Sequence, residues 1–219
     1  MTGNIILYLS PYSILFAAVI GVIRFKEIEK SYYPFLYICW LGLLFEVLAS
    51  IFQFTFKTMI PSNTYVLFEG LLYIWLFRNW GSFQKNGYMF YVILSAIVVA
   101  WILDNFVYNT IHLITSRYRI FYSIILVILS IDHINKLIVR ERKNFLRNAK
   151  FLICMAVISF FTYKIITEVF WMNINNKLSE TFFSKLFGIQ HYVNLIVNLL
   201  FAYVMLWIPK RKNFLERLP

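Results

Sequence analysis

The chain has little charge for its length. Only 14% of its 219 residues are Asp, Glu, Lys or Arg, whereas 61% are hydrophobic. A soluble domain of this size leaves much of its surface in water and needs more polar residues than these to cover it. The composition therefore excludes an ordinary soluble protein and indicates that lipid surrounds much of the chain.

Cysteine and histidine are scarce as well. Cys39 and Cys154 both lie in apolar segments, which excludes a disulfide framework and a cysteine-based metal site. The three histidines, His112, His133 and His191, are widely separated, whereas seven-helix zinc hydrolases of lipid amides have a closely spaced pair on one helix. We therefore expect no metal and no cofactor, and we lean against an enzyme. An intramembrane lipid hydrolase stays as the second alternative.

Glycine and proline are also rare, at seven and five residues. Transporter sites are commonly lined by broken helices, whose sequences contain Gly or Pro interruptions. Here only Pro11 and Pro34 lie within or at the start of apolar segments, so we expect continuous helices. A small-solute transporter or channel is therefore kept only as the first alternative.

Long apolar runs fill most of the sequence, and a helix needs about 20 such residues to cross a membrane. We predict a single domain over residues 1–219, an all-α, polytopic membrane bundle of seven transmembrane helices. The predicted helices cover about 4–24, 32–56, 63–80, 87–109, 114–135, 149–171 and 183–208. The third run is the shortest and carries Glu69, but without it the basic loop that follows the fifth run would face outward.

The basic residues show which way the chain is threaded. With seven crossings, 15 of the 21 Lys and Arg residues fall on one side of the membrane. Basic loops stay in the cytoplasm, so this places the N-terminus outside and the C-terminus inside. The predicted cytoplasmic basic patch comprises Lys136, Arg140, Arg142, Lys143, Arg147, Lys150, Lys210, Arg211 and Lys212. We expect it to contact anionic lipid headgroups rather than nucleic acid.

Polar residues within the apolar runs are the candidate functional residues. An ionisable group at the centre of a spanning helix costs at least about 2.5 kcal/mol on insertion scales and commonly faces a cavity or a partner. The candidates predicted in the outer half of the membrane are Glu46, Glu69, Asp104, Arg117, Arg119, Lys164, Glu168, Gln190 and His191. Asn194 and Asn198 are candidates that continue inward from His191.

Spacing relates some of these residues to one another. Lys164 and Glu168 are four residues apart and share a helix face, where we expect them to pair. His191, Asn194 and Asn198 follow at i, i+3 and i+7 and form a polar stripe that should face the bundle interior.

Two interpretations of these polar residues stay open. In the first, these residues form hydrogen bonds and ion pairs between helices that only hold the helices together. In the second, they line an outward-facing polar pocket in a non-enzymatic, receptor-like or partner-coupling bundle, which is the function we favour. A retinal protein is disfavoured because its lysine should lie mid-membrane on the last helix, where the only lysine, Lys185, is close to the boundary.

One stretch of sequence carries a resemblance. The segment Ile20 to Lys30 (IGVIRFKEIEK), followed by Glu46 and by Asn63-Thr64-Tyr65 to Glu69, resembles small seven-helix membrane proteins of Bacteroidota that have no assigned function. The resemblance implies a bacterial inner membrane. The expected partners are the lipid bilayer and either a membrane protein or a second copy of the chain.

Overall fold

The structure is a computed structural model that describes residues 10–84, 86–140, 147–172 and 180–211. Each predicted apolar run contains an α-helix. The α-helices are α2 (Ile14–Arg24), α3 (Tyr33–Phe56), α4 (Ile60–Asn79), α5 (Gly87–Ile102), α6 (Ser116–Arg140), α7 (Ala149–Met172) and α8 (Glu180–Trp207). A 3-10 helix, η1 (Lys30–Tyr32), precedes α3, and a π-helix, η2 (Leu103–Tyr108), continues α5.

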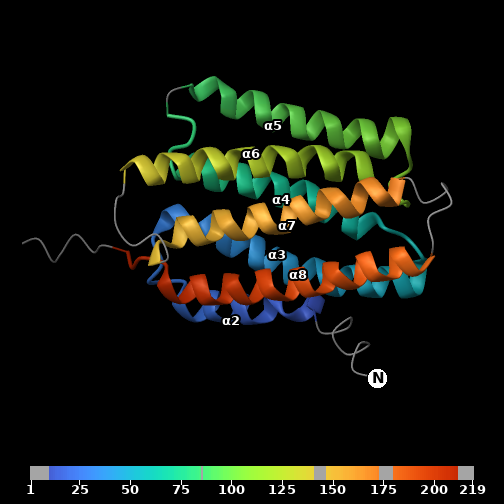
Figure 1. The fold of residues 1–219 in the computed structure, drawn as a ribbon, viewed down its shortest axis with the longest axis horizontal. Coiled ribbons are helices and arrows are strands. Elements are labelled where there is room, and N and C mark those ends of the chain that lie inside the picture. The colour runs from blue at the N-terminus through green and yellow to red at the C-terminus, as the bar shows by residue number, and fades with distance from the viewer. Residues whose placement is uncertain (1–9, 85, 141–146, 173–179, 212–219) are drawn as a thin grey trace, which may run out of the picture.

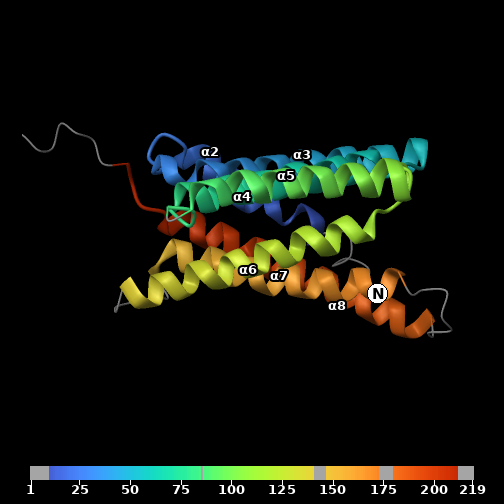
Figure 2. The same ribbon diagram turned by 90° about the horizontal axis from the view of Figure 1, so that it is seen from above.

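The helices run in alternating directions along the long axis of the molecule (Figure 1). Helices α2, α3, α4, α6, α7 and α8 each pack against the next, and α8 returns to α2, so these six form a closed ring. Helix α5 lies outside the ring against α4 and α6. Seen from above, α3, α4 and α5 form one layer and α6, α7 and α8 the other (Figure 2).

Five helical segments of the described chain are long and apolar enough to cross a membrane. They are Lys30–Phe56, Gly87–Tyr108, Ser116–Val139, Ala149–Met172 and Ser184–Trp207. The described part of the first helix, Ser10–Arg24, is apolar but shorter, and α4 does not meet the same composition. These features indicate a multi-pass integral membrane protein. The seven crossings and the orientation of the termini stay predictions, and residues 4–9 of the first run lie outside the described chain.

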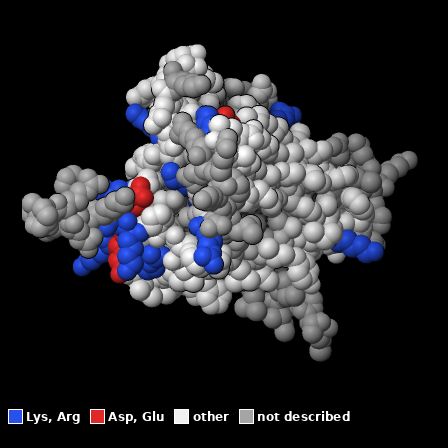
Figure 3. Space-filling view, turned by 60° about the vertical axis from the view of Figure 1, so that its left-hand side comes forward, with Lys and Arg blue, Asp and Glu red and all other residues white. Residues whose placement is uncertain are grey.

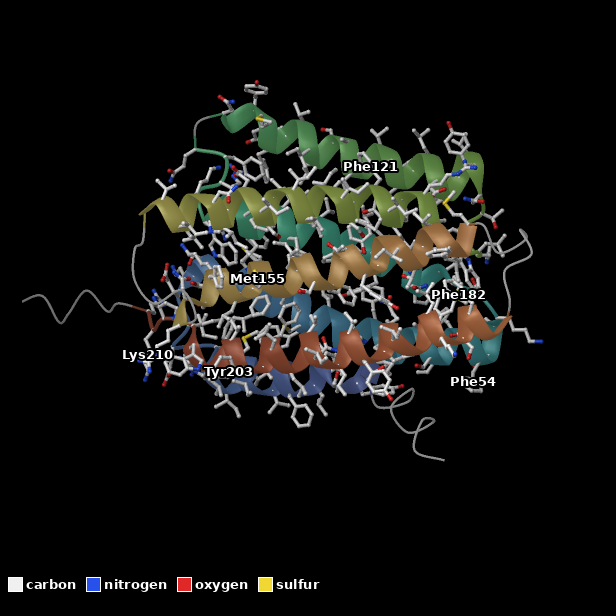
Figure 4. The ribbon with its side chains drawn as sticks, viewed as in Figure 1. Phe54, Phe121, Met155, Phe182, Tyr203 and Lys210 are labelled. Atoms are coloured by element: carbon white, nitrogen blue, oxygen red, sulfur yellow. The ribbon has the colours of Figure 1, made fainter. Side chains whose placement is uncertain are left out.

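Large apolar side chains cover the outside of the bundle. Phe54 is 90% exposed, and many other apolar side chains on the outer faces of the helices are also exposed. Figure 4 labels five of these exposed side chains, namely Phe54, Phe121, Met155, Phe182 and Tyr203. An apolar surface of this extent is unfavourable in water and suits contact with lipid chains.

The helix ends follow from local sequence and refine the predicted bounds. Proline lies in the first turn of both α3 and α4, where its missing N–H breaks no helical bond. Pro61 therefore lets α4 begin at Ile60 instead of the predicted residue 63. Helix α3 ends at Lys57, whose left-handed φ of 51° reverses the chain. Helix α6 continues to Arg140, five residues beyond its predicted end.

At the end of α5 the helix continues without a break, but its backbone widens into η2. This wider turn places the buried Asp104 against the N-terminus of α6. One Asp104 carboxylate oxygen accepts a hydrogen bond of 2.7 Å from the Tyr118 backbone N–H, and the other accepts one of 2.8 Å from Asn109 Nδ2. A carboxylate is favourable there because it binds an unpaired N–H and the positive end of the helix dipole.

We expect Asp104→Ala to lower the free energy of unfolding by about 1 to 2 kcal/mol, because α6 loses its cap. Reversible unfolding in mixed detergent micelles measures this. The control is Asp132→Ala on α6, where the partly exposed carboxylate pairs with Lys136 and should contribute less than about 1 kcal/mol. Equal losses in the two variants would show that Asp104 does not act as a cap.

The basic end is the end of the bundle where α2, α4, α6 and α8 finish. Figure 3 shows Lys and Arg side chains gathered there beside an almost uncharged wall. Arg24 donates to the carbonyls of Met205 and Ile208, which lie at and just beyond the end of α8. Ile28 and Lys210 form an isolated antiparallel bridge that joins the α2–η1 loop to the C-terminal segment.

The predicted basic patch lies largely at this end. Lys150 lies 5.9 Å from the Trp80 ring, Arg147 lies 5.9 Å from the Trp207 ring, and Lys210 pairs with Glu27 at 3.3 Å. Lys136 pairs with Asp132 at 2.5 Å, and Arg211 N–H donates to the Glu27 carbonyl. Arg142, Lys143, Lys212 and the Arg140 side chain lie outside the described part of the structure.

Candidate binding site

A cavity of about 150 Å³ lies inside the ring of helices, between α2, α3, α4, α7 and α8. Its polar lining residues are Glu46, Tyr65, Glu69, Lys164, Asn194 and Asn198. Aromatic rings of Tyr73, Phe160 and Phe201 line it as well. We call this space the central cavity. The sequence predicts Glu46, Glu69 and Lys164 at a similar depth on three helices, and the fold brings them to one space with the two asparagines.

Glu69 and Lys164 form an ion pair across the central cavity, from α4 to α7. Lys164 Nζ lies 3.6 Å from Glu69 Oε2, and both side chains are about nine-tenths buried. The Tyr122 hydroxyl accepts a 2.5 Å hydrogen bond from Lys164 and donates one of 2.8 Å to Glu69 Oε2. Tyr65 donates to the other carboxylate oxygen at 3.0 Å. These bonds compensate for burying the carboxylate.

Lys164 is also surrounded by aromatic rings. Its ammonium lies 5.1 to 5.5 Å from the ring centroids of Tyr122, Phe160 and Phe161. Ring faces attract a cation at such distances, and the attraction increases where water is excluded. Lys164 is thus held by the carboxylate, by the hydroxyl and by ring faces at once.

A second cavity, of about 360 Å³, adjoins the central one through Lys164. Arg119, Glu168 and Gln190 also line it, on α6, α7 and α8. Arg119 Nη1 lies 3.6 Å from Glu168 Oε1, so this cavity also contains an interhelical ion pair. The Thr167 hydroxyl lies 3.1 Å from Gln190 Oε1, to which it donates.

A third cavity, of about 380 Å³, opens at the end of the bundle opposite the basic end. Lys57 and His112 line it, and it shares Ile114 and Trp171 with the second cavity. The three cavities therefore form a row from this end toward the middle of the bundle.

On the side of the basic end the row stops at an apolar core. Phe35 and Leu36 from α3 have no exposed surface, and neither have Phe77 from α4, Val157 from α7 and Val204 from α8. Each lies on the basic-end side of the cavity residues of its own helix. The described structure is therefore closed between the central cavity and the basic end.

Asn63, at the start of α4, connects several segments at the end of the bundle opposite the basic end. Its side-chain NH2 donates to the carbonyls of Ile111 and Leu113 at 2.9 and 2.6 Å. Its side-chain oxygen accepts from Thr115 at 3.1 Å and from Arg119 at 3.2 Å. Its backbone carbonyl accepts a 2.8 Å hydrogen bond from the Trp101 indole. One buried amide therefore links α4 to the α5–α6 connection and positions Arg119.

Three predicted site residues lie away from the row of cavities. Asp104 caps α6, and the exposed Arg117 lies 5.1 Å from the Tyr108 ring. His191 Nδ1 lies 2.9 Å from Ser10 Oγ, beside α2. The stripe that His191 begins continues along α2, since Asn198 Nδ2 donates to Ser13 Oγ at 2.9 Å.

The predicted pairing of Lys164 with Glu168 is wrong. Both residues lie on one face of α7, as their spacing indicated, but each pairs across to a different helix. Lys164 reaches Glu69 on α4, and Glu168 reaches Arg119 on α6. Ion pairs between helices replace the pair along the helix because neighbouring helices bring oppositely charged groups to the same depth.

Sequence reasoning missed Tyr65, Tyr122 and Asn63. Tyr65 stands four residues before Glu69, a spacing that places both on one helix face and could have indicated their hydrogen bond. Tyr122 and Asn63 carried no such signal, because their partners come from other helices and from a loop. Among the described residues no group of three His, Cys, Asp or Glu side chains is placed to hold a metal ion.

The chain matches no protein-family model, no curated protein and no solved structure. The fold and composition define a multi-pass helical membrane protein. Its function is therefore argued from the row of cavities alone.

Proposed function

We propose that this protein is a receptor-like membrane protein of the bacterial inner membrane that binds a small ligand from the outer side. The central cavity is the binding site, and the second and third cavities are the route by which the ligand enters. The observation that carries this proposal is the row of cavities, which begins at the end opposite the basic end and stops at an apolar core.

The proposed orientation has seven crossings, with the N-terminus outside and the C-terminus in the cytoplasm. The alternating helix directions support this orientation (Figure 1). The basic end faces the cytoplasm, where each Lys or Arg near anionic headgroups contributes about 1 kcal/mol of attraction. The open third cavity then faces outward.

The buried charges support binding over a purely structural role. A bundle held together only by polar pairs does not need space around them, whereas here the pairs line cavities. Transport is less favoured, because fully buried apolar side chains lie between the central cavity and the basic end in the described structure. A zinc hydrolase is less favoured because His112 contacts Thr58, whereas His191 contacts Ser10 next to α2.

Cysteine labelling in intact cells tests the proposed entry route. The background variant has Cys39 and Cys154, both fully buried, replaced by alanine. In that background Gln190→Cys, in the second cavity, should react with a small membrane-impermeant thiol reagent added outside. Arg147→Cys, at the basic end, should react only after permeabilisation.

Ile153→Cys is the matched negative control, because residue 153 is fully buried in the apolar core. It should stay unlabelled in both conditions. Reaction of Arg147→Cys in intact cells would reverse the proposed orientation. Labelling of Gln190→Cys only after permeabilisation would show that the cavities do not open to the outside.

A further inference from the structure

The charges that line the central cavity do not balance. Glu46 and Glu69 are acidic, whereas Lys164 is the only basic residue among the described residues of the lining. Lys164 pairs with Glu69, whose two oxygens also accept hydrogen bonds from Tyr65 and Tyr122. If the cavity is a binding site, as proposed above, its unbalanced charge indicates what the site binds.

Glu46 is the residue that carries this excess charge. Its carboxylate forms no hydrogen bond or ion pair with any of the described residues, although its backbone carbonyl accepts one from Ser50 at 2.9 Å. It lies on α3, one helical turn beyond Gly42, which also lines the cavity. A carboxylate within a membrane bundle is costly without a partner, so a cation in the cavity would be strongly favoured.

We propose that the central cavity binds a small organic ammonium ion, with Glu46 as its counter-ion. Three other features of the lining fit such a ligand. Tyr73, Phe160 and Phe201 supply ring faces, which attract ammonium groups. Asn198 supplies a side-chain oxygen that accepts no hydrogen bond from the described residues, because its contacts with Ser13 and Asn194 use the NH2 group.

The size and lining of the cavity favour an organic cation over a bare metal ion. A volume of about 150 Å³ is that of an engineered protein cavity that holds benzene, so it accommodates a ligand of several heavy atoms. A hard metal ion is bound by about six or more oxygen ligands together, whereas this cavity offers one unpaired carboxylate and the Asn198 oxygen beside aromatic rings. An anion in the cavity would be repelled by Glu46, and Lys164 is already paired with Glu69.

Three probes of similar size and different charge test the proposal, namely n-propylammonium, propan-1-ol and propionate. The purified protein is reconstituted in phosphatidylcholine nanodiscs, and its thermal unfolding is followed against probe concentration at constant ionic strength. Propylammonium should raise the unfolding temperature in a saturable way, and the other two probes should not. A specific ligand of the folded state stabilises it in this manner.

Glu46→Gln keeps the shape of the side chain and removes its charge. This variant should bind propylammonium at least tenfold more weakly, whereas Glu29→Gln, an exposed carboxylate at the basic end, should bind it like the parent protein. Because Glu46 has no side-chain bond to lose, the variant should fold, and a single symmetric peak in size-exclusion chromatography verifies this.

The lipid headgroup phosphatidylethanolamine carries the same ammonium as a soluble amine. Adding this lipid to the nanodiscs shows whether the natural ligand is a lipid headgroup or a soluble amine. If the lipid weakens propylammonium binding, the headgroup occupies the cavity. If it does not, the ligand is a soluble amine. Either result depends on Glu46 and supports the ammonium site.

Other outcomes separate this inference from the proposed function. Stabilisation by propionate or propanol, or equal propylammonium binding by Glu46→Gln and the parent, would overturn the ammonium site and leave an outward-facing binding cavity. Absence of any response would overturn the ammonium site too. The proposed function itself fails if Gln190→Cys is unreactive from outside or if Arg147→Cys reacts in intact cells.

Discussion

Replacing Lys164 by methionine is expected to lower the free energy of unfolding by about 3 kcal/mol, the largest effect we predict for a single charge. Methionine retains most of the side-chain volume, but the Glu69 carboxylate then loses its cation while staying buried. The Tyr122 hydroxyl also loses a donor at 2.5 Å. Reversible unfolding in mixed micelles of a mild detergent and dodecyl sulfate measures the loss.

A double variant separates the ion pair from the packing. Glu69→Gln removes the charge that Lys164→Met leaves unpaired, so the two changes together should cost less than their sum by about 1 to 3 kcal/mol. The control is Lys185→Met, an exposed lysine on α8, which should stay within about 0.5 kcal/mol of the parent. Equal effects of Lys164→Met and Lys185→Met would show that the buried pair does not stabilise the fold.

The positions of the helices could be predicted from the sequence because each spanning helix needs an unbroken apolar run of a fixed length. The local geometry at the ends of the helices was harder to predict. The π-helix at Leu103–Tyr108 has the composition of an ordinary helix, and its Asp104 accepts a hydrogen bond from a backbone N–H on α6. A bond of this kind depends on how two helices meet, which the pattern along one helix does not specify.

The common depth expected for the candidate residues follows from residue number along a helix, which gives height at a fixed rise, and their depth in the membrane stays a prediction. Height alone does not give rotation about the helix axis or the order of helices in the ring. This is why Asp104 and Arg117 were grouped with Glu69, although they lie on the far side of the bundle beside α5. It is also why the spacing of Lys164 and Glu168 indicated a shared face and not their partners on α4 and α6.

Asn63 shows the same limit most clearly. In the sequence it is an ordinary polar residue near the start of an apolar run, a place where asparagine is common and commonly exposed. In the structure it is fully buried and bonded to the α5–α6 connection and to Arg119. Its importance depends on a loop about fifty residues further along the chain, whose path no periodicity predicts.

Asn63→Ala is accordingly expected to lower the free energy of unfolding by about 2 to 4 kcal/mol. The change removes four side-chain hydrogen bonds at once, and a buried group left without its partner costs about 1 to 3 kcal/mol. Unfolding in the same mixed micelles measures the loss. Asn79→Ala, an exposed asparagine at the other end of α4, is the matched control and should cost no more than about 0.5 kcal/mol.

The same variant should also loosen the end where ligand enters, because the α5–α6 connection and Arg119 lose their common anchor. Gln190→Cys should therefore label faster from outside when Asn63→Ala is present, and at an unchanged rate with Asn79→Ala. If Asn63→Ala lowers stability without changing this rate, Asn63 is a structural anchor with no influence on the cavities. If it changes neither, the buried hydrogen bonds of Asn63 do not hold this end of the bundle together.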